Sequence, residues 1–138
     1  SAQHKEYDDA IALYKEALRY ADNDTLRSHL FESIGNVEHE RNDMKRCYKA
    51  YDKALRYFAD NAGVLNNYAY FLALEERDLE RALTMITRAL ALSEKNATYL
   101  DTMAWVLYKL GRYDEAKKYM CARSARSARF FPTLFPSW

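Results

Sequence analysis

The histidine and cysteine side chains are the ones in this sequence best suited to metal binding or catalysis. They are His4, His29, His39, Cys47 and Cys121. His29 lies three residues before Glu32 and His39 lies four before Asp43, so each pair would share one face of a helix, where a metal pair is conceivable. The two histidines are ten residues apart and neither belongs to an HExxH motif, the spacing used by helical zinc sites. The alternative, histidines on a solvated helix face, fits this pattern better.

No other motif in the sequence points to a reaction. There is no glycine-rich phosphate loop, no GxSxG nucleophile elbow and no site of paired lysines. Catalysis needs titratable groups that converge in a pocket, and the sequence shows no such set. We therefore expect no enzymatic activity, no metal site and no cofactor.

Length and composition favour a helical domain and argue against two kinds of partner. The chain has 138 residues, of which 49% are apolar, with only three glycines and two prolines, so long helices with short connections are favoured. Lys plus Arg total 21 against 20 Asp plus Glu, and this balance predicts no attraction to nucleic acid or to anionic membranes. We expect no membrane span, because no apolar run approaches the roughly 18 residues needed, and no signal segment begins the sequence.

The stretch Asn96–Met120 predicts two amphipathic helices that meet at Gly111. The first carries apolar residues at the spacing i, i+3, i+4, i+7, namely Leu100, Met103, Ala104 and Leu107. Asn96 can cap this helix, and Gly111 ends it because glycine adopts the left-handed conformation without steric cost. The second helix begins at Tyr113. The short side chains of Ala104 and Ala116 would let the two helices cross closely.

The same pattern recurs three and a half times along the chain. An earlier copy has Leu65, Tyr68, Ala69 and Leu72 on its first helix and Ala82, Ile86 and Ala89 on its second. A third has Phe31, Ile34 and Gly35, then Cys47, Tyr51 and Ala54, and a half copy has Ala10, Tyr14 and Ala17. Gly35 precedes Ala69 by 34 positions, and Ala69 precedes Ala104 by 35. Cys47 takes a place where other copies have alanine, which favours a small buried residue over a disulfide or a reactive thiol.

A period of 34 with a small residue in each helix, an aromatic before the second helix and a final alanine resembles the tetratricopeptide repeat over Tyr7–Met120. The resemblance implies an all-α, right-handed superhelical solenoid of antiparallel helix pairs. It would contain a half repeat at 5–24, repeats at about 25–61, 62–96 and 97–128, and an aromatic tail at 129–138. The family's proline after the second helix is absent, since Asp22, Ala59 and Glu94 stand there.

Helix limits follow from the pattern and from capping residues. The expected helices are Glu6–Tyr20, Thr25–Arg41, Met44–Phe58, Ala62–Glu75 and Leu79–Leu92, followed by the pair around Gly111. The expected caps are Asp24, Asn42 or Asp43, Asn61, Asp78 and Asn96, because short polar side chains accept hydrogen bonds from the first helical N–H groups. The last helix is expected to extend to about Ala128.

In the family the first helices of the repeats line a concave groove, and the resemblance implies a binding site there. Superposing the copies gives a groove of nine residues: Glu32, Asn36, His39, Asn66, Asn67, Tyr70, Asp101, Trp105 and Tyr108. Tyr70 and Trp105 are large aromatics where a solvated face more often carries Lys or Glu, and such side chains are favoured in interfaces. The alternative is that these residues only solvate a helix face.

Some family members bind a C-terminal carboxylate with lysine, arginine and asparagines in this groove. Asn36 and Asn67 match the asparagine places, but Glu32, Thr98 and Thr102 occupy the cationic ones. We therefore exclude that subclass and expect a neutral or basic ligand.

The sequence thus predicts a scaffold that binds a protein or peptide segment. Two alternatives stay open: a structural spacer in a larger repeat protein, and an accessory ligand-binding domain. The aromatic tail, with Phe130, Phe131, Phe135 and Trp138, is expected to cover an apolar surface and to allow self-association, unless it is not native to the protein. A narrower resemblance of LDTMAWVLYKLGRYDEAKKYM to bacterial envelope and lipoprotein-type repeats leaves cytoplasm, periplasm and cell envelope open.

Overall fold

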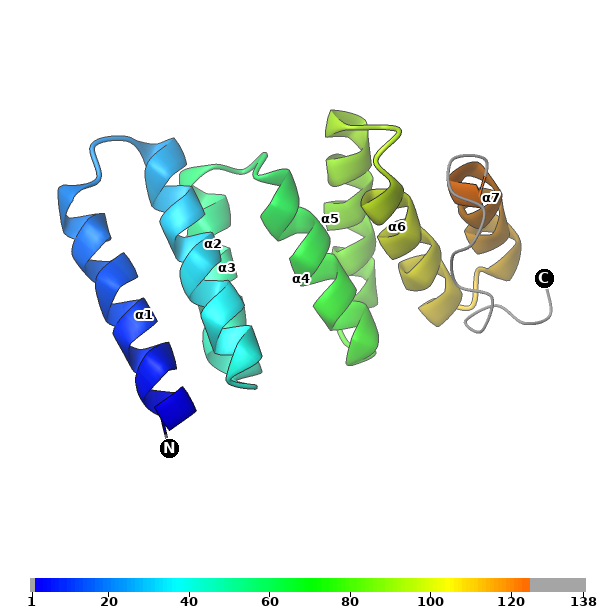
Figure 1. The fold of residues 1–138 in the computed structure, drawn as a ribbon. Helices are drawn as coiled ribbons and strands as arrows, with labels where there is room; N and C mark the ends of the chain where they lie inside the picture. The colour runs from blue at the N-terminus through cyan, green and yellow to red at the C-terminus, as the bar shows by residue number, and fades with distance from the viewer. Residues whose placement is uncertain (1, 125–138) are drawn as a thin grey trace. The chain divides into compact units, whose positions relative to one another are not determined.

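A computed structural model describes residues 2–124, and every regular element in that range is an α-helix (Figure 1). The helices are α1 (Ala2–Tyr20), α2 (Asp24–Glu40), α3 (Met44–Tyr57), α4 (Ala62–Leu74), α5 (Leu79–Leu92), α6 (Ala97–Lys109) and α7 (Tyr113–Ser124). This confirms the all-α prediction, with helix limits within a few residues of those expected. Over residues 2–124 no helix is both long and apolar enough to cross a bilayer. The predicted extension to Ala128 and the tail at 129–138 lie outside the described residues.

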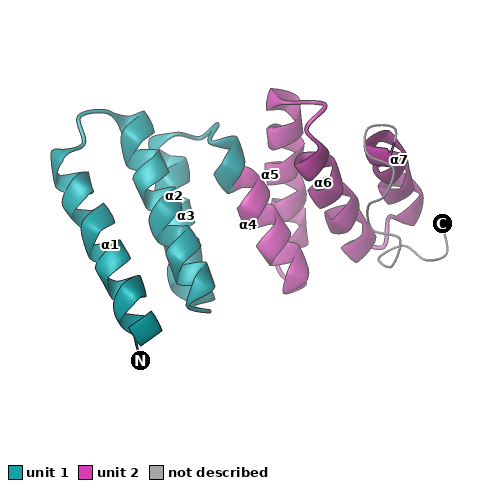
Figure 2. Cartoon of the chain, in the orientation of Figure 1, with its two compact units in different colours: residues 1–64 teal, residues 65–138 magenta. Residues whose placement is uncertain are grey.

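The chain divides into two compact units (Figure 2). Unit 1, residues 1–64, holds α1, α2, α3 and the first residues of α4. Unit 2, residues 65–138, holds the rest of α4 together with α5, α6 and α7. The seven helices of residues 2–124 follow the order expected for a half repeat and three helix pairs. The residue limits of the individual repeats stay a prediction.

Helix crossings occur where the sequence places its small residues. Ala69, Ala82, Ala104 and Ala116 are all fully buried, as expected for residues at close crossings. Cys47 is also fully buried, in agreement with its reading as a small core residue. In unit 1 helices α2 and α3 approach closely at Gly35 of α2, where an added Cβ would lie 2.5 Å from two ring carbons of Tyr51 in α3. Gly35 is therefore required by contact between two helices, because its own backbone is ordinary helix.

The turns within the helix pairs share one backbone geometry. Asn42, Glu76 and Gly111 all have positive φ, at 65°, 54° and 79°. In each turn the N–H of the following residue donates to the carbonyl five positions earlier, for example Arg112 N to Leu107 O at 2.9 Å. This pairing closes the end of a helix around a left-handed residue. Gly111 confirms the prediction, whereas Asn42 and Glu76 adopt the same conformation without being glycine.

Three of the five expected N-caps are confirmed, one is wrong and one differs in geometry. Asn61, Asp43 and Asn96 accept from the N–H groups of Val64, Arg46 and Tyr99. The cap of α2 is Asn23, whose Oδ1 accepts from Leu26 N at 2.7 Å, and not Asp24. Asp24 is the first residue of α2. Its negative charge is stabilised there by the helix dipole, and its carboxylate pairs with Arg27. Asp78 occupies the N-cap position before α5 in a left-handed conformation, but its side chain makes no capping bond.

Candidate binding surface

The nine predicted groove residues all lie on the first helices of their pairs. Glu32, Asn36 and His39 lie on α2 in unit 1. The other six lie in unit 2: Asn66, Asn67 and Tyr70 on α4, and Asp101, Trp105 and Tyr108 on α6. Because these residues belong to two compact units, a continuous groove along all nine remains a prediction.

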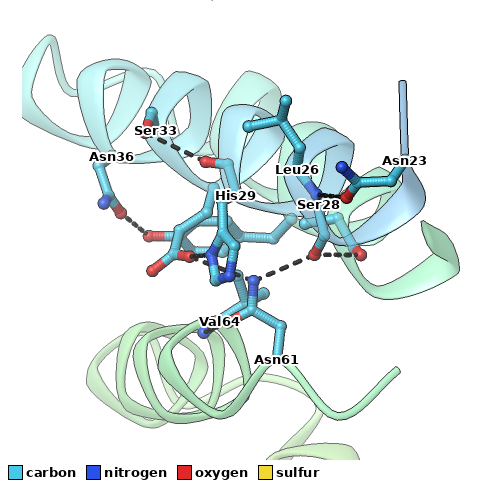
Figure 3. A network of polar contacts seen from close by, with 11 residues as sticks. Asn23, Leu26, Ser28, His29, Ser33, Asn36, Asn61 and Val64 are labelled. Carbon is cyan, nitrogen blue, oxygen red and sulfur yellow. Dashed lines mark hydrogen bonds and ion pairs between the residues drawn. The ribbon is translucent and has the colours of Figure 1, made fainter. Parts of the chain in front are cut away.

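In unit 1 the side chains of His29 on α2 and Asn61 before α4 point toward one another (Figure 3), and the carboxylate of Glu32 contacts both. Its Oε1 accepts from Asn61 Nδ2 at 3.1 Å and lies 3.1 Å from His29 Nδ1, and the side chain is only 22% exposed. A Cβ at Gly63 would lie 2.8 Å from Glu32 Oε2, so glycine leaves room for the carboxylate beside the first turn of α4. A negative charge at that place is favoured by the helix dipole. Glu32 thus has a structural role that sequence patterns did not indicate.

Asn61 is the centre of this polar network. Its Nδ2 also donates to Ser28 Oγ at 3.0 Å, and its Oδ1 accepts from Val64 N at 3.2 Å. Ser28 in turn donates to Ala54 O at the end of α3, at 2.8 Å. Asn61 and Ser28 are both buried, so these bonds satisfy groups that would otherwise be costly to bury. The network joins α2, the end of α3 and the start of α4 within unit 1.

Of the other two groove residues of α2, Asn36 is half-buried, like Glu32, and only His39 is exposed. Asn36 Oδ1 accepts from the hydroxyl of Tyr51, and this bond orients the amide. An amide whose oxygen is engaged still offers its NH₂ group as a donor, so Asn36 is suited to a ligand carbonyl.

In unit 2 the aromatic residues of α6 form a stacked group with the first residue of α7. The rings of Trp105 and Tyr108 are parallel within 3°, with centroids 5.6 Å apart, and Tyr113 packs edge-on against Tyr108 at 5.3 Å. We call Trp105, Tyr108 and Tyr113 the aromatic cluster. Lys109 Nζ lies 4.8 Å from the centre of the Trp105 ring and donates to Glu76 Oε1 at 2.8 Å. One face of Trp105 is therefore already covered by the chain itself.

The remaining groove residues of unit 2 range from exposed to buried. Tyr70 is 39% exposed, whereas Asn66 is buried and donates to Asn67 Oδ1 at 3.3 Å. Asp101 accepts from Arg123 Nε at 2.8 Å, and the two side chains are 13% and 8% exposed. The negative charge of Asp101 is therefore compensated within the chain. In the sequence, Arg123 stands where a repeat would place its final alanine. An arginine on a predicted core face is a signal that an acid lies opposite it.

Replacing Arg123 is expected to change the titration of Asp101. Burial raises the pKa of Asp101 above its ordinary value, and the hydrogen bond and charge of Arg123 oppose this rise. An acid with a raised folded-state pKa stabilises the fold at low pH, and this contribution is lost as the pH rises through that pKa. Arg123→Met should therefore raise the pKa of Asp101 further and deepen the loss of stability with rising pH.

The measurement is a titration of the side-chain carboxyl ¹³C signals by NMR, combined with urea unfolding at several pH values. Glu115 serves as the internal control, because its lowered pKa arises first from its hydrogen bond to Arg112 and should not change. An unchanged Asp101 titration in Arg123→Met would contradict the ion pair.

Comparison with known proteins agrees with this geometry. A family model described as tetratricopeptide repeat matches residues 97–122, the pair formed by α6 and α7. The crystal structure of the YrrB protein superposes with a TM-score of 0.76 at 16% identity, covering 97% of this chain and 67% of that one. The MamA crystal structure gives a TM-score of 0.71 at 13% identity, covering 91% of this chain and 68% of that one. The α6–α7 pair therefore matches a tetratricopeptide repeat, and the chain shares its fold with these two crystal structures.

No curated protein matches this chain in sequence. YrrB itself is described as having an unusual peptide-binding site. Among residues 2–124 no group of three or more His, Cys, Asp or Glu side chains is arranged to hold a metal ion.

Proposed function

We propose that this protein is an interaction scaffold that binds a peptide segment in unit 2, through Tyr70 and the aromatic cluster. The observation that carries the proposal is the stacking of Trp105 on Tyr108, with Tyr113 packed against the pair. Aromatic side chains provide large contact areas, and rings already fixed by one another lose little conformational freedom on binding. A partner that places an apolar side chain against this cluster would therefore bind a prepared surface.

The charges near the cluster favour a neutral segment. Asp101 is compensated by Arg123, and Lys109 by Glu76. No net charge then remains at these two pairs to attract a strongly acidic or basic ligand. The amide of Asn67 and the hydroxyl of the exposed Tyr70 are groups that would orient a peptide backbone. The described YrrB peptide site supports a peptide as the class of ligand.

The test is a peptide selection from a random displayed library, followed by affinity measurement of single peptides. We expect selected peptides to carry an aromatic or aliphatic anchor and to shift the amide NMR signals of α4 and α6. Tyr70→Ala should reduce the affinity of these peptides, because it removes a proposed contact. Tyr70 is exposed, so the substitution leaves the core unchanged. Peptides that bind with signal shifts confined to other helices, or no selectable peptide at all, would favour the structural spacer.

A further inference from the structure

Unit 1 carries a second surface, on the side of α3 that faces α1. Arg46, Lys49, Lys53 and Arg56 follow one another at intervals of three, four and three residues, which places them on one face of α3. Lys15 of α1 lines the same hollow of about 180 Å³ as Arg46, Lys49 and Lys53. Arg56 and Lys53 line the neighbouring hollow. We call these five residues the basic stripe.

Most of the positive charge in the basic stripe is uncompensated. Asp43 pairs with Arg46 at 3.2 Å, but both side chains are solvated, at 28% and 67% exposed. Lys15, Lys49 and Arg56 form no ion pair with any residue in the range 2–124. The one acid that lines the hollow beside Lys49, Glu38, is engaged by Arg41 at 2.9 Å. An acidic ligand would therefore meet three cations, Lys15, Lys49 and Arg56, that have no competing acidic partner in residues 2–124.

An apolar shelf lies between these cations. Phe31 lines both hollows and stacks on Tyr57, with ring centroids 5.7 Å apart and planes within 5°. Lys53 Nζ lies 5.5 Å from the centre of the Phe31 ring. Tyr57 is 42% exposed, so the edge of the stack is open to a ligand. Cations around an aromatic shelf are complementary to a ligand that carries both carboxylates and an apolar group.

We propose that the basic stripe and its Phe31–Tyr57 shelf bind an acidic peptide segment with an aromatic or aliphatic anchor. The cations from α1 and α3 would hold carboxylates on both sides of the anchor. A nucleic acid is the poorer match, because Glu38 and Asp43 stand among the cations and would face the continuous phosphate charge. This surface shares no residue with Tyr70 or the aromatic cluster, so the scaffold would hold two partners of different chemistry.

The experiment uses a fluorescein-labelled peptide of sequence EEDFEDE and measures its affinity for the full chain by fluorescence anisotropy. Lys15→Glu and Lys49→Glu test one cation from each helix, and both side chains are exposed. Each reversal is expected to weaken binding roughly 3- to 10-fold, since both lost attraction and new repulsion act in a partly exposed site. Affinity should also fall as salt is raised from 0.05 to 0.3 M, because screening of exposed charges increases.

The matched control is Lys95→Glu, which makes the same change in net charge at an exposed turn between α5 and α6 in unit 2. It should change affinity less than twofold, and Trp105→Ala should leave this binding intact. All variants are checked for unchanged helical circular dichroism and thermal midpoint.

Equal weakening by the three charge reversals would overturn the proposal, since it would show attraction to net charge alone. Undiminished binding of the peptide with alanine in place of its phenylalanine would overturn the role of the shelf. Tighter binding of a single-stranded RNA of equal charge would also overturn the proposal, since it would show that the basic stripe prefers phosphate groups to carboxylates.

Discussion

Gly35→Ala is expected to lower the free energy of unfolding by about 2 kcal/mol, the largest effect among alanine substitutions of the three glycines. The new Cβ would lie 2.5 Å from two ring carbons of Tyr51, well inside contact distance. The ring is fully buried and its hydroxyl is bound to Asn36, so it has no space to move away without losing that bond. Urea unfolding followed by circular dichroism measures the loss.

The two other glycines provide controls, because a methyl group added at each is opposed by a different physical cause. Gly111→Ala places its Cβ in open space, and only the positive φ of 79° resists it, so its cost of about 1 kcal/mol reports backbone strain alone. The Cβ in Gly63→Ala meets the end of the flexible Glu32 side chain, and we expect a smaller loss than at Gly35. In a Tyr51→Leu background the cost of Gly35→Ala should shrink. If it does not, the close contact with Tyr51 is not the cause.

Trp105→Ala is expected to weaken binding of the selected peptide roughly 30-fold or more. Truncating a tryptophan at the centre of an interface commonly reduces the binding free energy by about 2 kcal/mol or more. Trp105 holds Tyr108 by stacking, so its removal also releases the second ring of the aromatic cluster. The measurement is isothermal titration calorimetry with the purified variant and the selected peptide.

Trp105 also packs against the buried pair Ala104 and Met120, so loss of structure must be separated from loss of contact. Trp105→Phe keeps an aromatic ring at this place and should retain part of the affinity, while Lys118→Ala on the exposed side of α7 should retain all of it. Affinity unchanged in Trp105→Ala, with the fold intact, would remove the aromatic cluster from the binding surface.

The helices and the small residues at their crossings were predictable because a repeat fold is built from contacts between neighbours in sequence. The period of 34 located Ala69 and Ala104 at the crossings, and both are fully buried. Gly111 was recognisable as a left-handed turn residue because glycine is the usual choice. Glu76 was not, since nothing in its type favours positive φ, and only the geometry of the shared turn imposes it.

The wrong cap of α2 shows the limit of local reasoning. Asn23 and Asp24 are adjacent and both are good capping residues, so propensity alone cannot choose between them. In the structure Asn23 has the extended backbone that capping requires, and Asp24 lies one residue inside the helix. A difference of one residue at a helix end depends on how the preceding loop enters the helix.

The sequence by itself determined the fold class, the helix pairs and which residues lie on the first-helix faces, because helical periodicity and the repeat period are local properties. Only the tertiary structure decided what those residues do there. Glu32 is held by Asn61, 29 positions later, and Asp101 by Arg123, 22 positions later. Periodicity assigns a side chain to a face, but the charge it meets there is supplied by another helix, and that pairing depends on how the helices pack.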